Sequence, residues 1–319
     1  MLYAVELESL SLSVWFNSHA RLWPEGVTTS PVQTFRRFES GHSDVPAAIA
    51  WYIAELEEAR ERQELFRRRS PRILDALREH ALNESALSSN RIEGVTVDPA
   101  RVETVLFGKS QLRDQNEEEV RGYRQALERI HQGHANEHVS IGTIQELHRV
   151  ARAGLGDAGT FKTRDGDIIE RYEDGSVHVR FRPVSAVETP KFSQGLVEVW
   201  NRCLEEKRIH LLIALGAFSL DFLCIHPFRD GNGRVSRLLL LLQSCQVGYG
   251  VGRYISLERL IENNIERYYE TLEIGSQGWH QASHDPWPYI GFLLFILKKA
   301  YEELEEWVRE SGSPRVPWR

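Results

Sequence analysis

The chain has 319 residues, of which 41% are hydrophobic and 27% are charged, and its formal net charge at pH 7 is −7. This composition is that of an ordinary soluble globular protein with a sizeable core, and the length suggests about two domains. The negative charge disfavours a protein whose main partner is nucleic acid, and the arginines at 67–69 are better explained as a solvated helix face.

Neither export nor membrane insertion is indicated by the sequence. The N-terminal stretch MLYAVELESL has acids where a signal peptide would be basic. The apolar runs at 238–242 and 291–297 are too short to span a bilayer. Cys203, Cys224 and Cys245 form no CxxC pair, which predicts buried, reduced thiols. We therefore expect a cytoplasmic protein.

The periodicity of apolar residues predicts a nearly all-α chain with one small β-hairpin. Residues 1–45 are rich in turn signals and are predicted to be irregular. The hairpin comprises IIERY and VHVRF, which flank Glu-Asp-Gly-Ser within 159–183. We divide the chain into an N-terminal helical region (1–97), a core (98–295) and a C-terminal helix end with a tail (296–319). The predicted helices cover about 46–69, 71–94, 98–108, 114–136, 140–152, 189–206, 208–225, 233–246, 256–273 and 287–309.

The segment IHPFRDGNGRVSR at 225–237 combines residue types that build phosphate sites. His226 follows an apolar helix and precedes a proline, which pushes it out of helical geometry, so the histidine should face whatever the loop encloses. Gly231 and Gly233 flank Asn232. Because glycines lack a Cβ atom, the backbone N–H groups can turn inward as an anion nest where the next helix begins.

Charged residues complete the predicted site. Arg234 and Arg237 are one helical turn apart, so they share a face and can grip phosphate oxygens. Asp230 is an acid amid this positive potential, where it can hold Mg²⁺ that in turn binds phosphate. A histidine of near-neutral pKa is a natural general base for a hydroxyl nucleophile, which is the role we predict for His226. The alternative is that this segment only ends one helix and turns into the next. The combination of all these features in one segment makes that alternative the less favoured one.

The stretch HPFRDGNGRVSR at 226–237 matches without a gap the HxFx(D/E)GNGRxxR motif of the Fic family, and the resemblance extends over about 100–295. It implies an all-α core and, most often, transfer of AMP from ATP to a Tyr, Ser or Thr hydroxyl of a target protein. The roles that it implies are the base for His226, the Mg²⁺ ligand for Asp230, an anion hole for Gly231, Asn232 and Gly233, distal-phosphate binding for Arg234 and Arg237, and packing for Phe228.

Two further segments resemble parts of this family. The hairpin at about 165–183 is similar to the family's flap, which aligns the target segment by β-strand pairing. The stretch YYETL at 268–272 resembles the Tyr-Tyr helix beside the adenine, which implies nucleotide binding by Tyr268 and Tyr269. Packing of these two tyrosines in the core is an alternative of nearly equal weight.

The segment SNRIEG at 89–94 fits (S/T)xxxE(G/N), the inhibitory helix motif of the same superfamily. Ser89 and Glu93 are four residues apart and so lie on one face of the predicted helix. The resemblance places Glu93 against the second motif arginine, Arg237, where it would keep the guanidinium from the γ-phosphate. A solvated glutamate before a C-cap glycine is the alternative, and the complete motif elsewhere in the chain favours the inhibitory role.

The leading hypothesis is therefore a Mg²⁺- and ATP-dependent protein adenylyltransferase that Glu93 autoinhibits. Another transfer on the same scaffold (phosphoryl, another nucleotide or removal of AMP) is an alternative, but kinase-like members alter the GNGR loop that is intact here. A nucleotide-sensing regulator that binds DNA is a second alternative, although the tail SGSPRVPWR is too short for the winged helix that some Fic proteins carry. The expected partners are ATP, an unidentified target protein and a second copy in a homodimer, with no membrane.

Other histidine-rich stretches are weaker candidates. His131, His134 and His138 could suggest a metal site, but no cysteine or flanking pattern supports one, and a polar loop between helices is the better explanation. The stretch that contains Trp279, His280, His284 and Trp287 is predicted to be a loop that packs onto the core.

Overall fold

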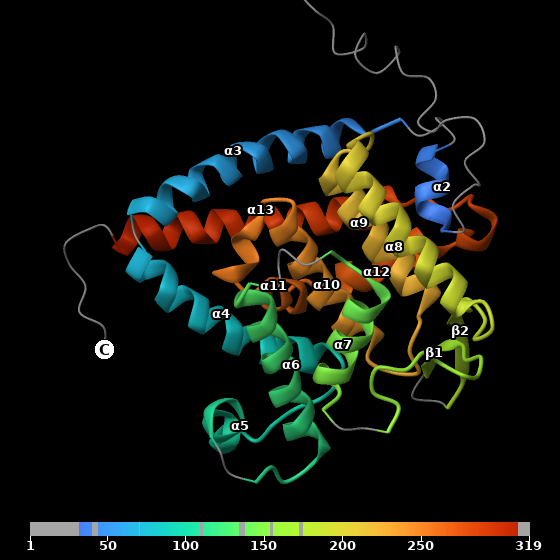
Figure 1. Ribbon diagram of the computed structural model, residues 1–319, viewed down its shortest axis with the longest axis horizontal. Helices are drawn as coiled ribbons and strands as arrows, with labels where there is room; N and C mark the ends of the chain where they lie inside the picture. The colour runs from blue at the N-terminus through green and yellow to red at the C-terminus, as the bar shows by residue number, and fades with distance from the viewer. Residues whose placement is uncertain are drawn as a thin grey trace, which may run out of the picture.

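The computed structural model describes residues 32–39, 44–69, 71–108, 111–133, 138–153, 156–171 and 175–311. The regular secondary structure of these residues is almost entirely helical, as predicted (Figure 1). None of their helices is long and apolar enough to cross a membrane. Short 3-10 helices are η1 (Pro99–Arg101), η3 (Gly250–Arg253) and η4 (Trp279–Gln281). The α-helices are α2 (Gln33–Glu39), α3 (Ala47–Arg69), α4 (Pro71–Ile92), α5 (Val102–Phe107), α6 (Gln115–His131), α7 (Ile141–Ala151), α8 (Thr189–Glu206), α9 (Leu211–Ile225), α10 (Asn232–Gln246), α11 (Leu257–Glu262), α12 (Ile265–Ser276) and α13 (Trp287–Ser311).

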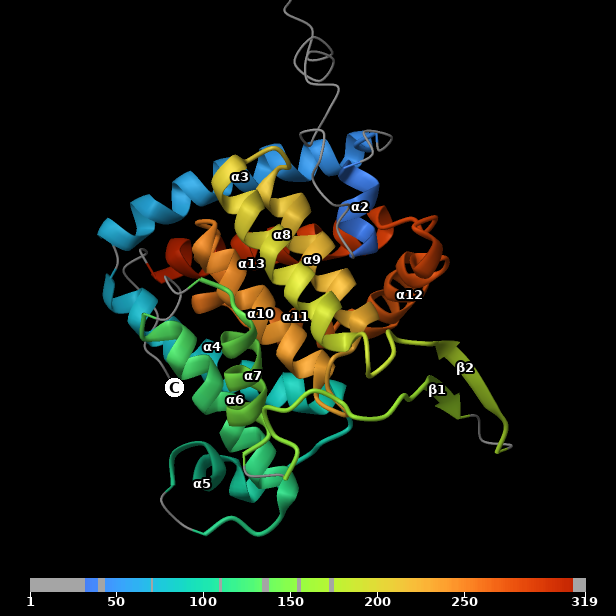
Figure 2. The ribbon, with the colours of Figure 1, turned by 45° about the vertical axis from the view of Figure 1, so that its right-hand side comes forward.

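Helix α9 lies at the centre of the fold because its sequence, LLIALGAFSLDFLCI, is apolar on nearly every face. Helices α8, α10 and α13 pack around it (Figures 1 and 2). Helix α10 is also buried, through the five consecutive leucines at 238–242. The loop that carries the predicted site joins α9 to α10, so both of its ends are fixed in the core.

The N-terminal helices pack against the rest of the chain. Helix α3 runs alongside α13, and α4 packs against α6 and α11 (Figure 1). Near the end of α4, Arg91 forms a two-pronged ion pair with Glu262 of α11, with N···O distances of 2.6 and 2.8 Å. The end of α4 is thereby held against α11. The predicted division of the chain at 97 and 295 stays a prediction, and α13 crosses residue 295 without a break.

The prediction that residues 1–45 are irregular is wrong where helix α2 forms, and residues 1–31 lie outside the described residues. Tertiary contacts stabilise α2, because Phe35 is fully buried and Thr34 contacts a carboxylate of α9. That carboxylate, Asp221, accepts hydrogen bonds at one oxygen from the Thr34 N–H (3.0 Å), the Thr34 hydroxyl (2.6 Å) and the Trp279 indole (2.6 Å). A local sequence pattern carries no trace of these distant partners.

Two predicted helices have different limits in the structure. The helix predicted at 256–273 is divided into α11 and α12 at Asn263 and Asn264. The Asn264 side chain donates to the Leu260 carbonyl oxygen (2.8 Å), and such bonds compete with the regular helix. The helix predicted at 114–136 ends at His131, and residues 134–137 lie outside the described residues.

The predicted hairpin is confirmed and projects from the helical body (Figure 2). Strands β1 (Ile168–Arg171) and β2 (Val177–Phe181) pair antiparallel, with Ile169 opposite Val179, and the register shifts next to Ile168. Several apolar side chains of the hairpin, including Val179, are exposed. The hairpin therefore presents these side chains to solvent, whereas Phe181 at its base packs against the core.

Candidate active site

The backbone of His226 ends helix α9 in the left-handed conformation, with φ 52° and ψ 62°. Its N–H donates to the Phe222 carbonyl oxygen (2.9 Å), and its Nδ1 lies 3.3 Å from the Leu223 carbonyl oxygen. Because a carbonyl can only accept, Nδ1 carries the proton and Nε2 keeps a free lone pair. Burial and the nearby charge of Lys162 lower the pKa of His226 to about 4, so the imidazole is neutral at pH 7.

The loop after His226 is closed by the side chain of Asn232. Its Oδ1 accepts from the Phe228 N–H (2.9 Å), and its Nδ2 donates to the Phe228 carbonyl oxygen (2.8 Å). The Phe228 ring is buried and stacks on the His148 ring at 3.8 Å, which agrees with the packing role expected for it. Gly231 has φ 80°, a conformation that glycine adopts without strain. The Asn232 side chain therefore shapes the loop, and only its backbone N–H is left to contact an anion.

Arg237 lies buried between α10 and the end of α4. Its Nε donates to the Ser89 hydroxyl (2.9 Å), and its Nη2 donates to the Ser89 carbonyl oxygen (2.9 Å) and to Glu93 Oε1 (2.7 Å). Burial opposes the charge of Arg237, but the Glu93 carboxylate outweighs it and raises the arginine's pKa above its usual range. The remaining nitrogen, Nη1, is buried with no hydrogen-bond partner among the described residues.

Glu93 occupies the space in front of the first turn of α10. A Cβ atom at Gly233 would overlap Glu93 Oε1 and would lie 3.2 Å from Arg237 Nη1. A carboxylate oxygen thus lies at the N-terminus of a helix, next to an arginine, which is the environment that favours phosphate oxygens. Ser89 and Glu93 are both at this place, as the spacing of the SNRIEG segment predicts.

Arg234 is equally buried but has different partners. Its Nη1 donates to Glu119 of α6 and, at 3.3 Å, to the Asn90 side chain. Glu119 also accepts from Arg152, the residue that follows α7 (2.9 Å), and the Arg152 Nη1 donates to Asp230 Oδ2 at 2.6 Å. Arg234 and Asp230 are therefore joined through a buried ionic network whose centre is Glu119.

Asp230 is the acid at the mouth of the loop, and its side chain is 59% exposed. Although burial opposes it, the charges of Arg152 and Arg234 lower the pKa of Asp230, so the side chain is a carboxylate at neutral pH. Among the described residues, no group of three or more His, Cys, Asp or Glu side chains could hold a metal ion. Mg²⁺ commonly uses one protein carboxylate together with phosphate oxygens and water, and a single half-exposed aspartate fits that arrangement.

Three residues of this network were not predicted from the sequence: Glu119, His148 and Arg152. The His148 Nδ1 accepts from the Gly159 N–H (2.8 Å), so its Nε2–H donates to the Asp230 carbonyl oxygen (3.0 Å). His148, near the end of α7, and Arg152, just after it, both contact Asp230 of the loop. The helical spacing could have paired them with each other, but no sequence signal connects α7 with residue 230.

The two predicted adenine-site tyrosines have different environments. Tyr268 is 4% exposed and packs against Tyr289 and Phe292, so the core alternative describes it. Tyr269 is 39% exposed and lines a surface cavity of about 440 Å³ together with residues of α12 and Arg180 of β2. Only Tyr269 is thus accessible for contact with a ligand.

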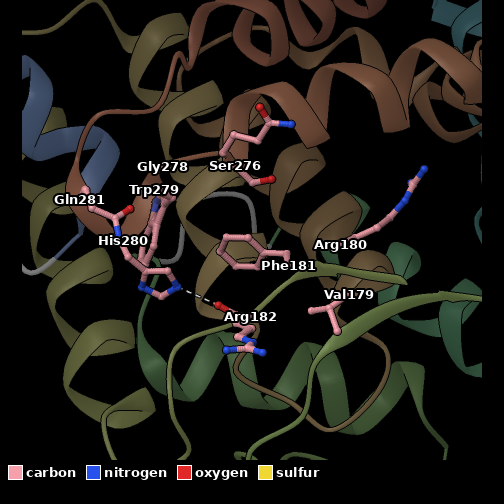
Figure 3. Close-up of a pocket in the computed structure, with 10 residues that line it drawn as sticks. Val179, Arg180, Phe181, Arg182, Ser276, Gly278, Trp279, His280 and Gln281 are labelled. Carbon is pink, nitrogen blue, oxygen red and sulfur yellow. Dashed lines mark hydrogen bonds between the residues drawn. The ribbon is translucent and has the colours of Figure 1, made fainter. Parts of the chain in front are cut away.

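A second cavity, of about 390 Å³, lies between β2 and η4 (Figure 3). The ring of His280 stacks on Phe181 of the hairpin at 5.5 Å, and its Nε2 lies 2.7 Å from the Arg182 carbonyl oxygen. Trp279 and His284 are buried, whereas Trp287 begins α13. The stretch predicted to be a loop therefore contains η4 and the start of α13; Trp279 and His284 pack in the core as expected, whereas His280 is exposed and contacts the base of the hairpin.

The remaining histidines do not form a common site in the described residues. His131 is buried at the end of α6, where its Nδ1 accepts from Arg78 (3.3 Å), and burial lowers its pKa to about 3. His134 lies outside the described residues.

Comparison with known proteins gives consistent relatives. Residues 138–244 match the family model Fic/DOC family. A Fic family protein from Desulfovibrio desulfuricans G20 is 27% identical, with 83% of this chain and 76% of that chain covered and a TM-score of 0.67. A Fic domain containing signaling protein from Bacteroides thetaiotaomicron is 20% identical, with 85% and 100% covered and a TM-score of 0.63. Fic-1 from C. elegans is 19% identical, with 83% and 74% covered and a TM-score of 0.59.

The match at 138–244 begins just before α7 and ends within α10, so it includes the hairpin, α9 and the loop with His226. The solved structures share the surrounding helical fold over more than four-fifths of this chain. Residues 138–244 are therefore similar to the Fic/DOC family, and the surrounding helices have the fold of Fic family proteins, a likeness that indicates a Fic-type transferase.

Proposed function

We propose that the protein transfers AMP from ATP to a hydroxyl group of a target protein, and of itself, with His226 as the general base. The observation that carries this proposal is the position of His226, whose Nδ1 lies against the Leu223 carbonyl oxygen at the loop that leads into the buried N-terminus of α10. A base and an anion site on one rigid loop are the two parts that transfer of a phosphorus group to a hydroxyl requires.

Three features of α10 support binding of a polyphosphate. Its first N–H groups carry the positive end of the helix dipole, and the glycine at 233 lets an anion approach the backbone closely. The Arg237 Nη1 is buried next to Gly233 and has no hydrogen-bond partner among the described residues. A buried N–H without a partner is costly, and a phosphate oxygen would satisfy it.

The transfer step then follows from the residues of the loop. The hydroxyl oxygen of the target forms a bond to the α-phosphorus of ATP while the bond to the pyrophosphate oxygen breaks. The hydroxyl proton passes to Nε2 of His226, and pyrophosphate leaves. Asp230 is the residue that would hold Mg²⁺, which when bound neutralises charge on the phosphates. The position of His226 sets the geometry of attack, because its backbone and Nδ1 are both hydrogen-bonded.

We further propose that Glu93 inhibits this reaction. Its carboxylate lies where an anion would meet Gly233, and it holds Arg237 in an ion pair of 2.7 Å. Arg237 cannot then turn to the γ-phosphate. ATP could still enter, but its phosphates would take an unproductive position, and a small misplacement costs about 10²-fold in rate.

The intact GNGR sequence favours adenylyl transfer over phosphoryl transfer, and the two reactions leave different atoms on the product. The test is incubation of the protein with ATP labelled at the α-phosphate and, separately, at the γ-phosphate, with and without a chelator of Mg²⁺. Covalent label from the α-phosphate alone, lost in the chelator, is the expected result. Label from the γ-phosphate alone would replace the proposal with kinase chemistry.

A further inference from the structure

Lys162 lies outside the sequence motif, in the segment between α7 and β1, and it contacts the chain on both sides of His226. Its backbone N–H donates to the Pro227 carbonyl oxygen at 2.9 Å. Its side-chain Nζ donates to the Ile225 carbonyl oxygen at 3.1 Å. The two acceptors belong to the residues immediately before and after His226, so Lys162 bridges the two residues that flank the histidine.

This bridge matters because His226 has an unusual backbone. A residue with a side chain adopts the left-handed conformation rarely, and it keeps that conformation only where its surroundings fix it. The bonds of His226 itself, to Phe222 and Leu223, fix its connection to α9. Lys162 adds hydrogen bonds to the carbonyl oxygens of residues 225 and 227, one on each side of the histidine.

We propose that Lys162 is a positioning residue for the reaction: it holds His226 in the left-handed conformation from both sides and places a positive charge beside the imidazole. The proposal deepens the proposed function, since it concerns the residue assigned there as the base. Lys162 itself does not touch the reacting atoms.

The charges around the imidazole come from three elements. Lys162 faces it from the segment before the hairpin, Glu93 from the end of α4, and Asp230 from the loop. Burial and the Lys162 charge lower the pKa of His226, whereas the two carboxylates raise it, and the result is about 4. Burial also lowers the pKa of Lys162, to about 8, so its ammonium group is charged at neutral pH. The charge of Lys162 therefore favours the neutral, basic form of His226.

The test compares Lys162→Met, Lys162→Arg and the control Lys191→Met with a protein that keeps both lysines. For kinetics, all four proteins also carry Glu93→Gly. Lys162→Met keeps the backbone N–H and the apolar stem but removes the ammonium group. Lys191 is an exposed lysine of α8, so Lys191→Met is the matched control. The readouts are kcat, KM for ATP, the pH profile of transfer, and the titration of the His226 ring by NMR in the protein without nucleotide.

For Lys162→Met we expect kcat to fall about tenfold with KM for ATP unchanged, because ordering of the base is lost while the phosphate site is intact. The midpoint of the His226 titration, and the acidic limb of the pH profile, should move up by about one pH unit. Lys162→Arg should restore most of kcat and most of the original midpoint of the His226 titration. A His226 titration and kcat equal to those of Lys191→Met would overturn the proposal, as would a change in KM alone.

The NMR titration separates this inference from the proposed function. If no variant transfers AMP but the His226 midpoint still rises in Lys162→Met, the reaction is wrong and the role of Lys162 stands. If AMP transfer is established and the His226 midpoint does not move in Lys162→Met, the proposed reaction stands and the role of Lys162 is wrong.

Discussion

The two arginines of α10 are one turn apart and equally buried, yet the carboxylates that bind them differ. Arg234 is held by Glu119, a 4% exposed side chain in the second turn of α6 that also binds Arg152. Arg237 is held by Glu93, whose side chain is 29% exposed and lies just beyond the end of α4. A carboxylate locked between two arginines inside a helix cannot leave without unfolding the site. One at a helix end can move away with little rearrangement, so only the second pair is suited to be exchanged for a phosphate.

The largest expected effect concerns the general base, His226, which lies at the loop that leads into the helix of both arginines. In the Glu93→Gly background, His226→Ala should lower the rate of AMP transfer by about 10²–10⁴-fold, because the general base is lost. Binding of ATP, measured by calorimetry, should be nearly unchanged, since Arg237 and the start of α10 are intact. Rapid self-modification by the double variant would show that the proton acceptor is another group.

The next effect concerns stability and separates the two carboxylates. Glu119→Gln leaves two buried guanidinium groups without their shared anion, which should lower the free energy of unfolding by about 3–5 kcal/mol. Glu93→Gln should cost about 1 kcal/mol, because Arg237 keeps both bonds to Ser89. Denaturant unfolding of the two variants gives the comparison. Equal losses would mean that Glu93 is as structural as Glu119.

Release of Glu93 should change activity rather than folding. Glu93→Gly should raise the rate of AMP transfer by about 10²-fold, self-modification included, because Arg237 becomes available to the phosphates. The measurement is incorporation of α-labelled ATP, with Glu93→Gln as a variant of the same size and lower charge. If Glu93→Gly is no faster than the unmodified protein, the SNRIEG segment is an ordinary helix end.

The smallest effect is expected at Ser89. Its hydroxyl accepts from Arg237 Nε, and its carbonyl oxygen accepts from Nη2 regardless of the side chain. Ser89→Ala should therefore raise transfer by a few-fold at most, because Glu93 still pairs with Arg237. An activation equal to that of Glu93→Gly would move the inhibitory role from the carboxylate to the serine.

The elements that the sequence predicts well are those whose signals are local. The apolar α9, the loop with its glycines and the leucines of α10 are contiguous, and the spacing of Ser89 and Glu93 needs only one helix. Helix α2, by contrast, depends on Asp221, and the anchoring of the loop depends on Glu119, His148, Arg152 and Lys162. These residues come from separate elements, and their relation to the loop arises only when the helices pack.

The carboxylate of Asp221 has a consequence for anyone who wishes to shorten the protein. Of its donors, Thr34 and Phe35 belong to α2 and Trp279 to η4, and all lie outside the 138–244 match. Residues 138–244 alone therefore lack the partners of this buried carboxylate. In a fragment of residues 138–244, Asp221 of α9 would have lost these donors, and its carboxylate would be hydrogen-bonded to water instead.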